Sequence, residues 1–238
     1  MYDMKRKNKL SEKQQVMILL AVIGAILVYC IASSISMHKN AFVYEESLDK
    51  TVLTVDDRQV TLREFGYYIY EVERFVGEQA VIYDASNPKE YWNKHFRAGR
   101  LGAFVSVMAR DEAYSLCICD IIYEEMALRE GYQLNDQEIA KAKEAADQIY
   151  SKMSEQQIAK TGLSLQLIEQ IQCRKKLIAK FARDYVKTID FTGYEGYREE
   201  LLSAGGAYYQ KEILPGHKVK CDEWIKNNLK FGKITINQ

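Results

Sequence analysis

TVLTVDDRQVTLREF, residues 51–65, is the stretch that decides the fold of this chain. Alternating β-forming residues on either side of Asp56 predict a small hairpin. Thr61 and Glu64 then form a capping-box pattern, in which the glutamate can reach back to the amide of the capping residue. We therefore expect a hairpin that leads directly into a helix starting near Leu62.

The rest of the body is predicted to be mainly α. Apolar residues recur at three- and four-residue steps, and the 238 residues include only 13 glycines and 2 prolines. Capping residues and glycines such as Gly131 and Gly162 mark helix ends. The predicted helices cover, by residue number, 62–83, 87–99, 103–130, 135–151, 154–162, 164–187, 194–213 and a stretch after 222. Short strands are predicted at 218–220 and, as a terminal strand, at 233–236.

The charges balance overall but not locally. The chain has 33 basic and 33 acidic residues, so no basic excess favours a nucleic-acid partner. The first 37 residues hold five basic and two acidic groups, which leaves 28 basic and 31 acidic groups for the rest. The basic surplus therefore lies at the N-terminus, and the body is mildly acidic.

An uncharged segment follows the basic N-terminus. Residues 16–36 contain no charge, and as a helix they would span roughly 30 Å, the thickness of a bilayer core. The positive-inside rule then predicts a cytoplasmic tip (1–15), a transmembrane signal-anchor (16–37), a juxtamembrane linker (38–50) and an extracytoplasmic body (51–238). The expected location is the cell membrane, with a single pass through the lipid bilayer.

A cleavable signal peptide is the alternative to an anchor. Ala32 and Ser34 form a small-x-small pair after the apolar stretch, as cleavage sites do. Cleavage would release the body as a secreted protein. Both interpretations predict export.

Two stretches resemble the N-terminal chaperone domain of SurA- and PrsA-type extracytoplasmic folding factors. TVLTVDDRQVTLREF is similar to the opening hairpin and helix start of that domain. IIYEEMALREGYQLNDQEIAKAKEAADQIYSKMSEQQIAKTGLSLQLIEQIQCRKKLIAKF is similar to its later helices, with their glycine steps and capped starts. The resemblance covers about 51–187 and implies a helical domain with a small sheet, completed by residues 194–238. It also implies ATP-independent binding of unfolded exported polypeptides.

The chain departs from this family where the family carries its enzyme. Family members usually insert a parvulin-type prolyl isomerase domain, but here only a few residues separate 187 from 194, too few for a domain. The three histidines, His38, His95 and His217, show no metal or triad spacing. We therefore expect no catalytic residues, no metal and no cofactor, and isomerase activity stays an alternative by family label only.

Aromatic and methionine side chains are the candidate client contacts. Such side chains pack against many unfolded sequences without fixed geometry. The competing interpretation is that a thin helical domain uses both faces of its helices as core. An adaptor or structural subunit of an envelope or secretion complex is the alternative function. The candidate contacts are Phe65, Tyr67, Tyr68, Tyr70, Phe75, Met108 and Met126.

Overall fold

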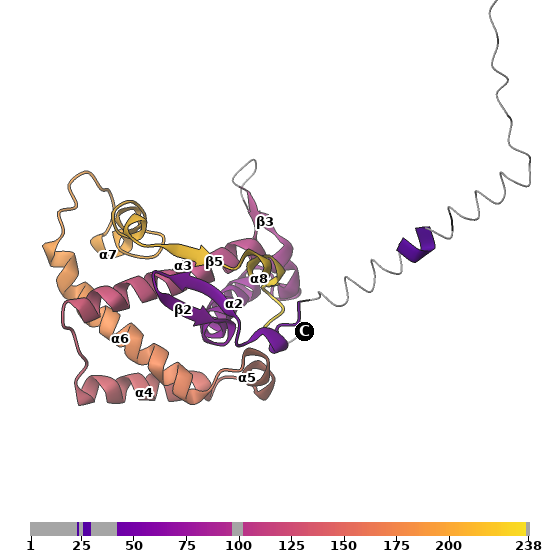
Figure 1. Ribbon diagram of the computed structural model, residues 1–238, viewed down its shortest axis with the longest axis horizontal. Helices are drawn as coiled ribbons and strands as arrows, with labels where there is room; N and C mark the ends of the chain where they lie inside the picture. The colour runs from indigo at the N-terminus through magenta and orange to yellow at the C-terminus, as the bar shows by residue number, and fades with distance from the viewer. Residues whose placement is uncertain (1–22, 24–25, 30–41, 97–101, 237–238) are drawn as a thin grey trace, which may run out of the picture. The chain divides into compact units, whose positions relative to one another are not determined.

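The computed structural model describes residues 23, 26–29, 42–96 and 102–236. The chain divides after residue 42, and the described residues from 43 onward belong to one compact unit. The larger unit is mainly helical and contains a small three-stranded sheet and a two-stranded ribbon (Figure 1). The predicted mainly α class, with a small sheet, is thereby confirmed.

The predicted hairpin is present, and its first strand is the central strand of the three-stranded sheet. Strands β1 (Thr51–Val55) and β2 (Arg58–Thr61) pair antiparallel, and Asp56 in the turn has a φ of 51°. Strand β5 (Val219–Cys221) pairs antiparallel with the other edge of β1, which gives the order β2-β1-β5. A segment distant in sequence therefore provides the third strand of the sheet.

Local capping signals explain where the long helices begin. The Thr61 hydroxyl accepts a hydrogen bond from the Glu64 amide at 3.2 Å, and Asn135 and Ser154 open complete capping boxes. Gly162 adopts the left-handed conformation that ends a helix. The four long helices are α2 (Leu62–Tyr83), α3 (Val105–Arg129), α4 (Asp136–Tyr150) and α6 (Leu165–Thr188). The shorter helix α5 (Glu155–Thr161) lies between α4 and α6 in the chain.

Shorter elements replace two of the predicted helices. The helix expected over 87–99 is a single 3₁₀ segment followed by a two-residue strand, and the one expected over 194–213 is split into short turns. The short elements are η1 (Glu45–Ser47), η2 (Pro88–Asn93), β3 (His95–Phe96), β4 (Ala103–Phe104), α7 (Arg198–Leu201), the π-helical η3 (Tyr209–Ile213), η4 (Leu214–Gly216) and α8 (Glu223–Asn228).

The core lies where α2, α3 and the sheet meet. Helix α6 packs on α3 from another side, and α4 runs beside α6 (Figure 1). Val52, Val60, Phe65 and Ile69 are fully buried in this core. Burial of each such side chain contributes about 1.5–3 kcal/mol relative to exposure.

The structure does not support the transmembrane helix predicted over 16–37. Within the described residues, no helix combines the length and the apolar character that crossing a bilayer requires. Helix α3 is 25 residues long, but charged side chains interrupt it. Most of the predicted segment, together with 1–15, lies outside the described residues.

The predicted linker over 38–50 is also only partly a linker. Its second half belongs to the folded body, because Ser47 and Leu48 are buried and the Arg63 amide donates a 2.7 Å hydrogen bond to the Leu48 carbonyl. These contacts hold η1 against the start of α2. Residues 38–41 lie outside the described residues.

The terminal strand predicted over 233–236 is wrong. These residues form turns and pair with no strand among the described residues. Their amides instead bind the side chain of Glu73, a buried residue of α2. The C-terminal region therefore returns to the hairpin through β5 and to α2 through a carboxylate.

Candidate functional site

An open apolar groove lies between α2 and α3. Its volume is about 520 Å³, and η2 and β3 close one end. Phe75 of α2 and Met108 of α3 both line it and are 58% and 45% exposed, large fractions for such apolar side chains. We call this the apolar groove; its other apolar lining residues are Val72, Val76, Tyr91, Phe96, Val105, Ala109 and Leu116.

The helical repeat of α2 does not by itself expose Phe75. Phe65, Ile69 and Val72 follow that repeat and are buried, and Phe75, three residues after Val72, continues it but is exposed because it lines the open groove. The ring of Tyr91 packs against that of Phe96, with centroids 5.8 Å apart, and supports the wall of the groove. The floor is therefore apolar and built from four different elements.

The rim of the apolar groove carries charges of both signs. Arg74 forms ion pairs with Glu78 at 2.7 Å and with Glu71 at 3.8 Å, and Glu112 lies on the opposite wall. Exposed ion pairs of this kind contribute little energy. An apolar segment can thus enter without a strong charge requirement.

Tyr83 extends the exposed apolar surface beyond the groove. It lies at the end of α2, is 57% exposed and packs beside Tyr91, with ring centroids 5.2 Å apart. Contiguous exposed apolar surface of this kind is typical of a binding surface. Val81, Ile82 and Phe104 are also exposed.

The structure separates the seven predicted client contacts into two groups. Phe75 and Met108 line the apolar groove, and Met126 lies on α3 outside it, partly exposed. The other four, Phe65, Tyr67, Tyr68 and Tyr70, are between 0% and 5% exposed. They are core residues and offer no surface to a client.

Hydrogen bonds explain how these tyrosines are buried. The Tyr68 hydroxyl donates to Asp120 at 3.0 Å, and the Gln172 amide donates to the Tyr67 hydroxyl at 2.8 Å. Burial raises the pKa of both phenols. The hydroxyls therefore stay neutral and paired, which removes the cost of burying them.

Tyr91 and Phe96 line the groove, but the sequence predicted the wrong secondary structure for them. The helix expected over 87–99 would have placed these two side chains about 140° apart around its axis. Strands β3 and β4 are only two residues long each, so they leave no alternating pattern to recognise. The signal available was a cluster of aromatic residues beside a proline.

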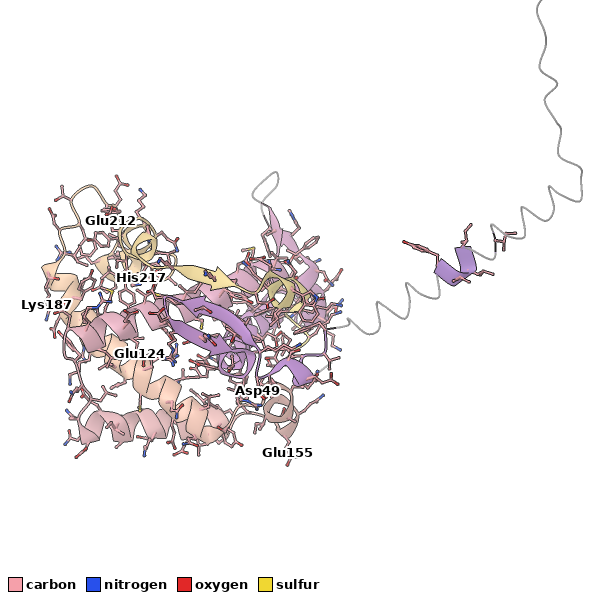
Figure 2. The ribbon with its side chains drawn as sticks, in the orientation of Figure 1. Asp49, Glu124, Glu155, Lys187, Glu212 and His217 are labelled. Carbon is pink, nitrogen blue, oxygen red and sulfur yellow. The ribbon has the colours of Figure 1, made fainter. Side chains whose placement is uncertain are left out.

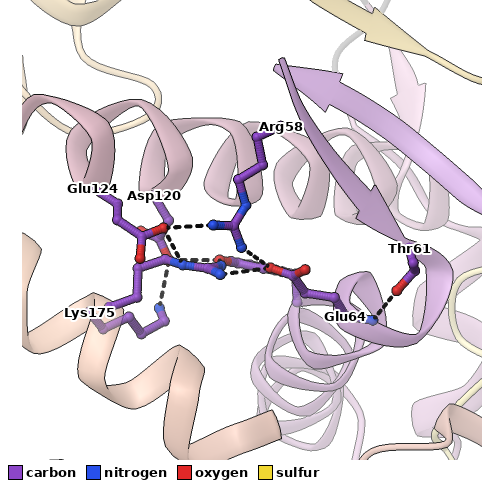
Figure 3. Close-up of polar contacts among 8 residues, drawn as sticks. Arg58, Thr61, Glu64, Asp120, Glu124 and Lys175 are labelled. Carbon is purple, nitrogen blue, oxygen red and sulfur yellow. Dashed lines mark hydrogen bonds and ion pairs between the residues drawn. The ribbon is translucent and has the colours of Figure 1, made fainter. Parts of the chain in front are cut away.

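A buried ionic network lies apart from the groove (Figure 3). The Arg174 guanidinium bridges Glu64 and Glu124, with both N–O distances at 2.8 Å. Arg58 bridges the same two carboxylates at 2.9 and 3.2 Å. The four side chains come from β2, α2, α3 and α6, so the network joins the sheet to three helices. Each charge in the network has an opposite partner, which offsets the cost of removing these charges from water.

Three potential metal ligands meet at the hairpin turn. Asp56, Glu125 and His217 offer ligand atoms within 4.8 Å of one another, although they are far apart in sequence. His217 lies just before β5 (Figure 2), and its Nδ1 is 2.7 Å from Asp56 Oδ2. Glu125 pairs with Arg129 at 2.6 Å. Both carboxylates already have protein partners, so the cluster serves to fasten the turn.

The environment of Asp56 supports that structural role. Its Oδ1 accepts a 2.8 Å hydrogen bond from the Lys218 amide, and its own amide donates to the Lys218 carbonyl at 2.8 Å. The Lys218 amide and then His217 hold the pKa of the Asp56 carboxyl below its usual value. The ionised aspartate therefore links the β1–β2 turn to the start of β5.

Compared with protein-family models, with curated proteins and with solved structures, the chain matches none. The resemblance to SurA- and PrsA-type chaperone domains thus rests on the quoted stretches of sequence.

Proposed function

We propose that this protein is an ATP-independent chaperone-like protein that binds unfolded polypeptide segments in the apolar groove. The observation that carries the proposal is the exposure of Phe75 and Met108 in one cavity with Tyr91 and Phe96. The sequence resemblance to the SurA- and PrsA-type domain supports the same function.

The size of the groove suits weak, reversible binding. Transfer of one apolar side chain from water into such a site contributes about 1.5–3 kcal/mol. Two or three side chains would offset the cost of ordering a flexible segment and leave a dissociation constant in the micromolar range or weaker. Such binding lowers the free concentration of aggregation-prone chain and still lets the client leave to fold.

The residue types in the groove favour many clients over one. Met108 is flexible and polarisable, and can adapt to side chains of different shape. The rim carries one cation, Arg74, and the carboxylates of Glu71, Glu78 and Glu112, and exposed charges of this kind contribute little to selection. A broad preference for apolar segments follows.

Removal of the apolar contacts should abolish protection of clients. We expect the full-length wild-type chain to suppress aggregation of a denatured model protein, followed by light scattering, at a few-fold molar excess. The double variant Phe75→Ser, Met108→Ser should lose most of this protection. Both side chains are more than 40% exposed, so the variant should keep its fold, which circular dichroism checks.

A matched control separates the groove from general surface hydrophobicity. Leu128 and Tyr197 are 57% and 76% exposed and lie outside the apolar groove. The variant Leu128→Ser, Tyr197→Ser should protect as well as the wild type. The proposal fails if the wild type gives no protection, or if the groove variant and the control variant are equally active.

An adaptor subunit would give a different binding pattern. It would recover a single partner at fixed stoichiometry, and its binding would not compete with denatured clients. The chaperone proposal predicts that unrelated denatured proteins compete with one another for the apolar groove. Absence of competition would favour the adaptor.

A further inference from the structure

A second groove adjoins the apolar groove and differs from it in charge. It has a volume of about 680 Å³ and lies between the second half of α2, η2, the start of α3 and residues 227–236. Four cationic residues line it, and its lining includes no aspartate or glutamate. We call it the cationic groove; its cations are Lys89, Arg110, Lys230 and Lys233.

Three of these cations have no acidic partner within the described part of the chain. Arg110 pairs with Asp111 at 3.2 Å, whereas no ion pair there involves Lys89, Lys230 or Lys233. The chain as a whole has equal numbers of basic and acidic residues. Four cations without a carboxylate in one lining are therefore a local concentration of positive charge, which attracts anions.

The floor of the cationic groove is apolar. Trp92 lies at its base, and Leu229 and Phe231 contribute further apolar surface. Gly232 has a φ of +85°, and a Cβ there would lie 2.5 Å from the Trp92 ring. Only glycine lets the backbone lie so close to the indole. The groove thus combines an apolar base with a cationic rim.

Glu73 holds the wall that carries two of the lysines. Its carboxylate accepts hydrogen bonds from the amides of Gly232, Ile234 and Thr235. Lys233 lies within this anchored turn, and Lys230 lies two residues before it. The positions of these cations are therefore set by a buried interaction and not by a loose terminus.

The two grooves share walls but are separate compartments. Tyr91 lines the apolar groove and Trp92 the cationic one, and the same holds for Val76 with Gly77 and for Val105 with Ser106. Consecutive residues of a helix point about 100° apart, so α2 and α3 present different faces to the two grooves. The apolar floor of the cationic groove therefore has to provide the apolar contacts of a segment bound there.

We infer that the cationic groove binds the acidic residues of client segments, so that the protein prefers stretches in which apolar and acidic residues adjoin. This inference rests on the proposed function and specifies its clients. Four cations distributed over η2, α3 and the C-terminal turn exceed what the single carboxylate of a fatty acid can satisfy. A polypeptide with several carboxylates and apolar side chains matches both the rim and the floor.

Two labelled peptides test this preference by fluorescence anisotropy on the full-length protein. They share the same leucines and phenylalanines and differ only in whether glutamate or glutamine follows them. We expect the glutamate peptide to bind the wild type about tenfold more tightly at low salt, and the difference to vanish at about 1 M salt, where charges are screened within about 3 Å.

Charge reversal identifies the groove. The variant Lys230→Glu, Lys233→Glu should lose the preference for the glutamate peptide and still bind the glutamine peptide. Lys141 and Lys152 are exposed, form no ion pair within the described residues and do not line the cationic groove. The control variant Lys141→Glu, Lys152→Glu changes the net charge equally and should keep the preference.

The outcomes separate this inference from the proposed function. Equal affinity of the wild type for both peptides, or a preference that survives Lys230→Glu, Lys233→Glu, would overturn the inference and leave the chaperone proposal intact. Displacement of the glutamate peptide by oleate at lower concentration than by unlabelled peptide would overturn it in favour of a lipid anion. Failure of the glutamine peptide to depend on Phe75 and Met108 would instead overturn the proposed function.

Discussion

Replacement of Glu73 by glutamine is expected to lower the free energy of unfolding by about 3–5 kcal/mol. The side chain is 0% exposed, and it accepts hydrogen bonds from the amides of Gly232, Ile234 and Thr235 at 2.5, 3.3 and 2.5 Å. The Thr235 hydroxyl donates a further bond at 2.6 Å. Burial raises the pKa of this carboxyl, and the four donors oppose the rise.

The size of the effect follows from the geometry of the donors. Each carboxylate oxygen receives two hydrogen bonds, so a glutamine must turn its NH₂ group toward N–H or O–H donors on one side. Buried donors are then left without an acceptor. The turn over 231–236 should detach from α2, and the cationic groove should lose its wall.

Urea unfolding followed by tryptophan fluorescence measures the loss. Trp92 packs against Gly232, so its emission also reports detachment of the turn. Glu78→Gln is the matched control, because Glu78 lies on the same helix, is exposed and, among the residues that the structure describes, forms an ion pair with Arg74 alone. The control should change stability by less than about 1 kcal/mol. A Glu73→Gln variant as stable as the control would contradict the role of Glu73 as an anchor.

Replacement of Arg174 by methionine is expected to cost about 3 kcal/mol of unfolding free energy, because two carboxylates in the interior lose their main partner. The Arg174 side chain is 5% exposed, and those of Glu64 and Glu124 are 14% and 19% exposed. Arg58 stays beside both carboxylates but is 39% exposed, so it compensates only in part.

A combined variant separates the network from simple packing. Arg174→Met together with Glu64→Gln and Glu124→Gln removes the unpaired charges and should recover part of the lost stability. Arg129→Met, which removes an exposed ion pair with Glu125, serves as control and should be nearly neutral. The role of the ionic network in stability is contradicted if Arg174→Met costs as little as the control. It is also contradicted if the costs of the three substitutions simply add in the triple variant.

Most of the secondary structure could be predicted from local signals in the sequence. The hairpin before Thr61, the caps at Asn135 and Ser154 and the helix end at Gly162 each depend on a few neighbouring residues. Such signals can be recognised in sequence because the atoms that interact are close along the chain.

Contacts between distant residues could not be predicted in the same way. No local pattern states that β5, and not residues 233–236, pairs with β1, or that His217 reaches Asp56. Glu73 gave a partial signal, because a single carboxylate on the apolar stripe of α2 four residues after Ile69 requires buried donors. The sequence did not show which segment supplies them.

Contacts between distant residues also explain why some predicted client contacts are buried and others are exposed. Tyr67 and Tyr70 fall off the apolar face of α2, which suggested exposed aromatic surface. In the structure α3, α5 and the sheet contact α2, and Gln172 of α6 binds the Tyr67 hydroxyl, so both tyrosines are buried. Phe75 and Met108 line the open groove between α2 and α3 and are exposed.

Direct observation of Met108 during client binding tests whether the apolar groove is the binding site. The chain has seven methionines, and ¹³C-methyl labelling with a Met108→Leu variant would assign the Met108 signal in NMR spectra. The account predicts that an unfolded client shifts or broadens this signal in a saturable way, while that of Met153, 7% exposed in the core, stays unchanged. A Met108 signal that does not respond at client concentrations that saturate binding would contradict the apolar groove as the binding site.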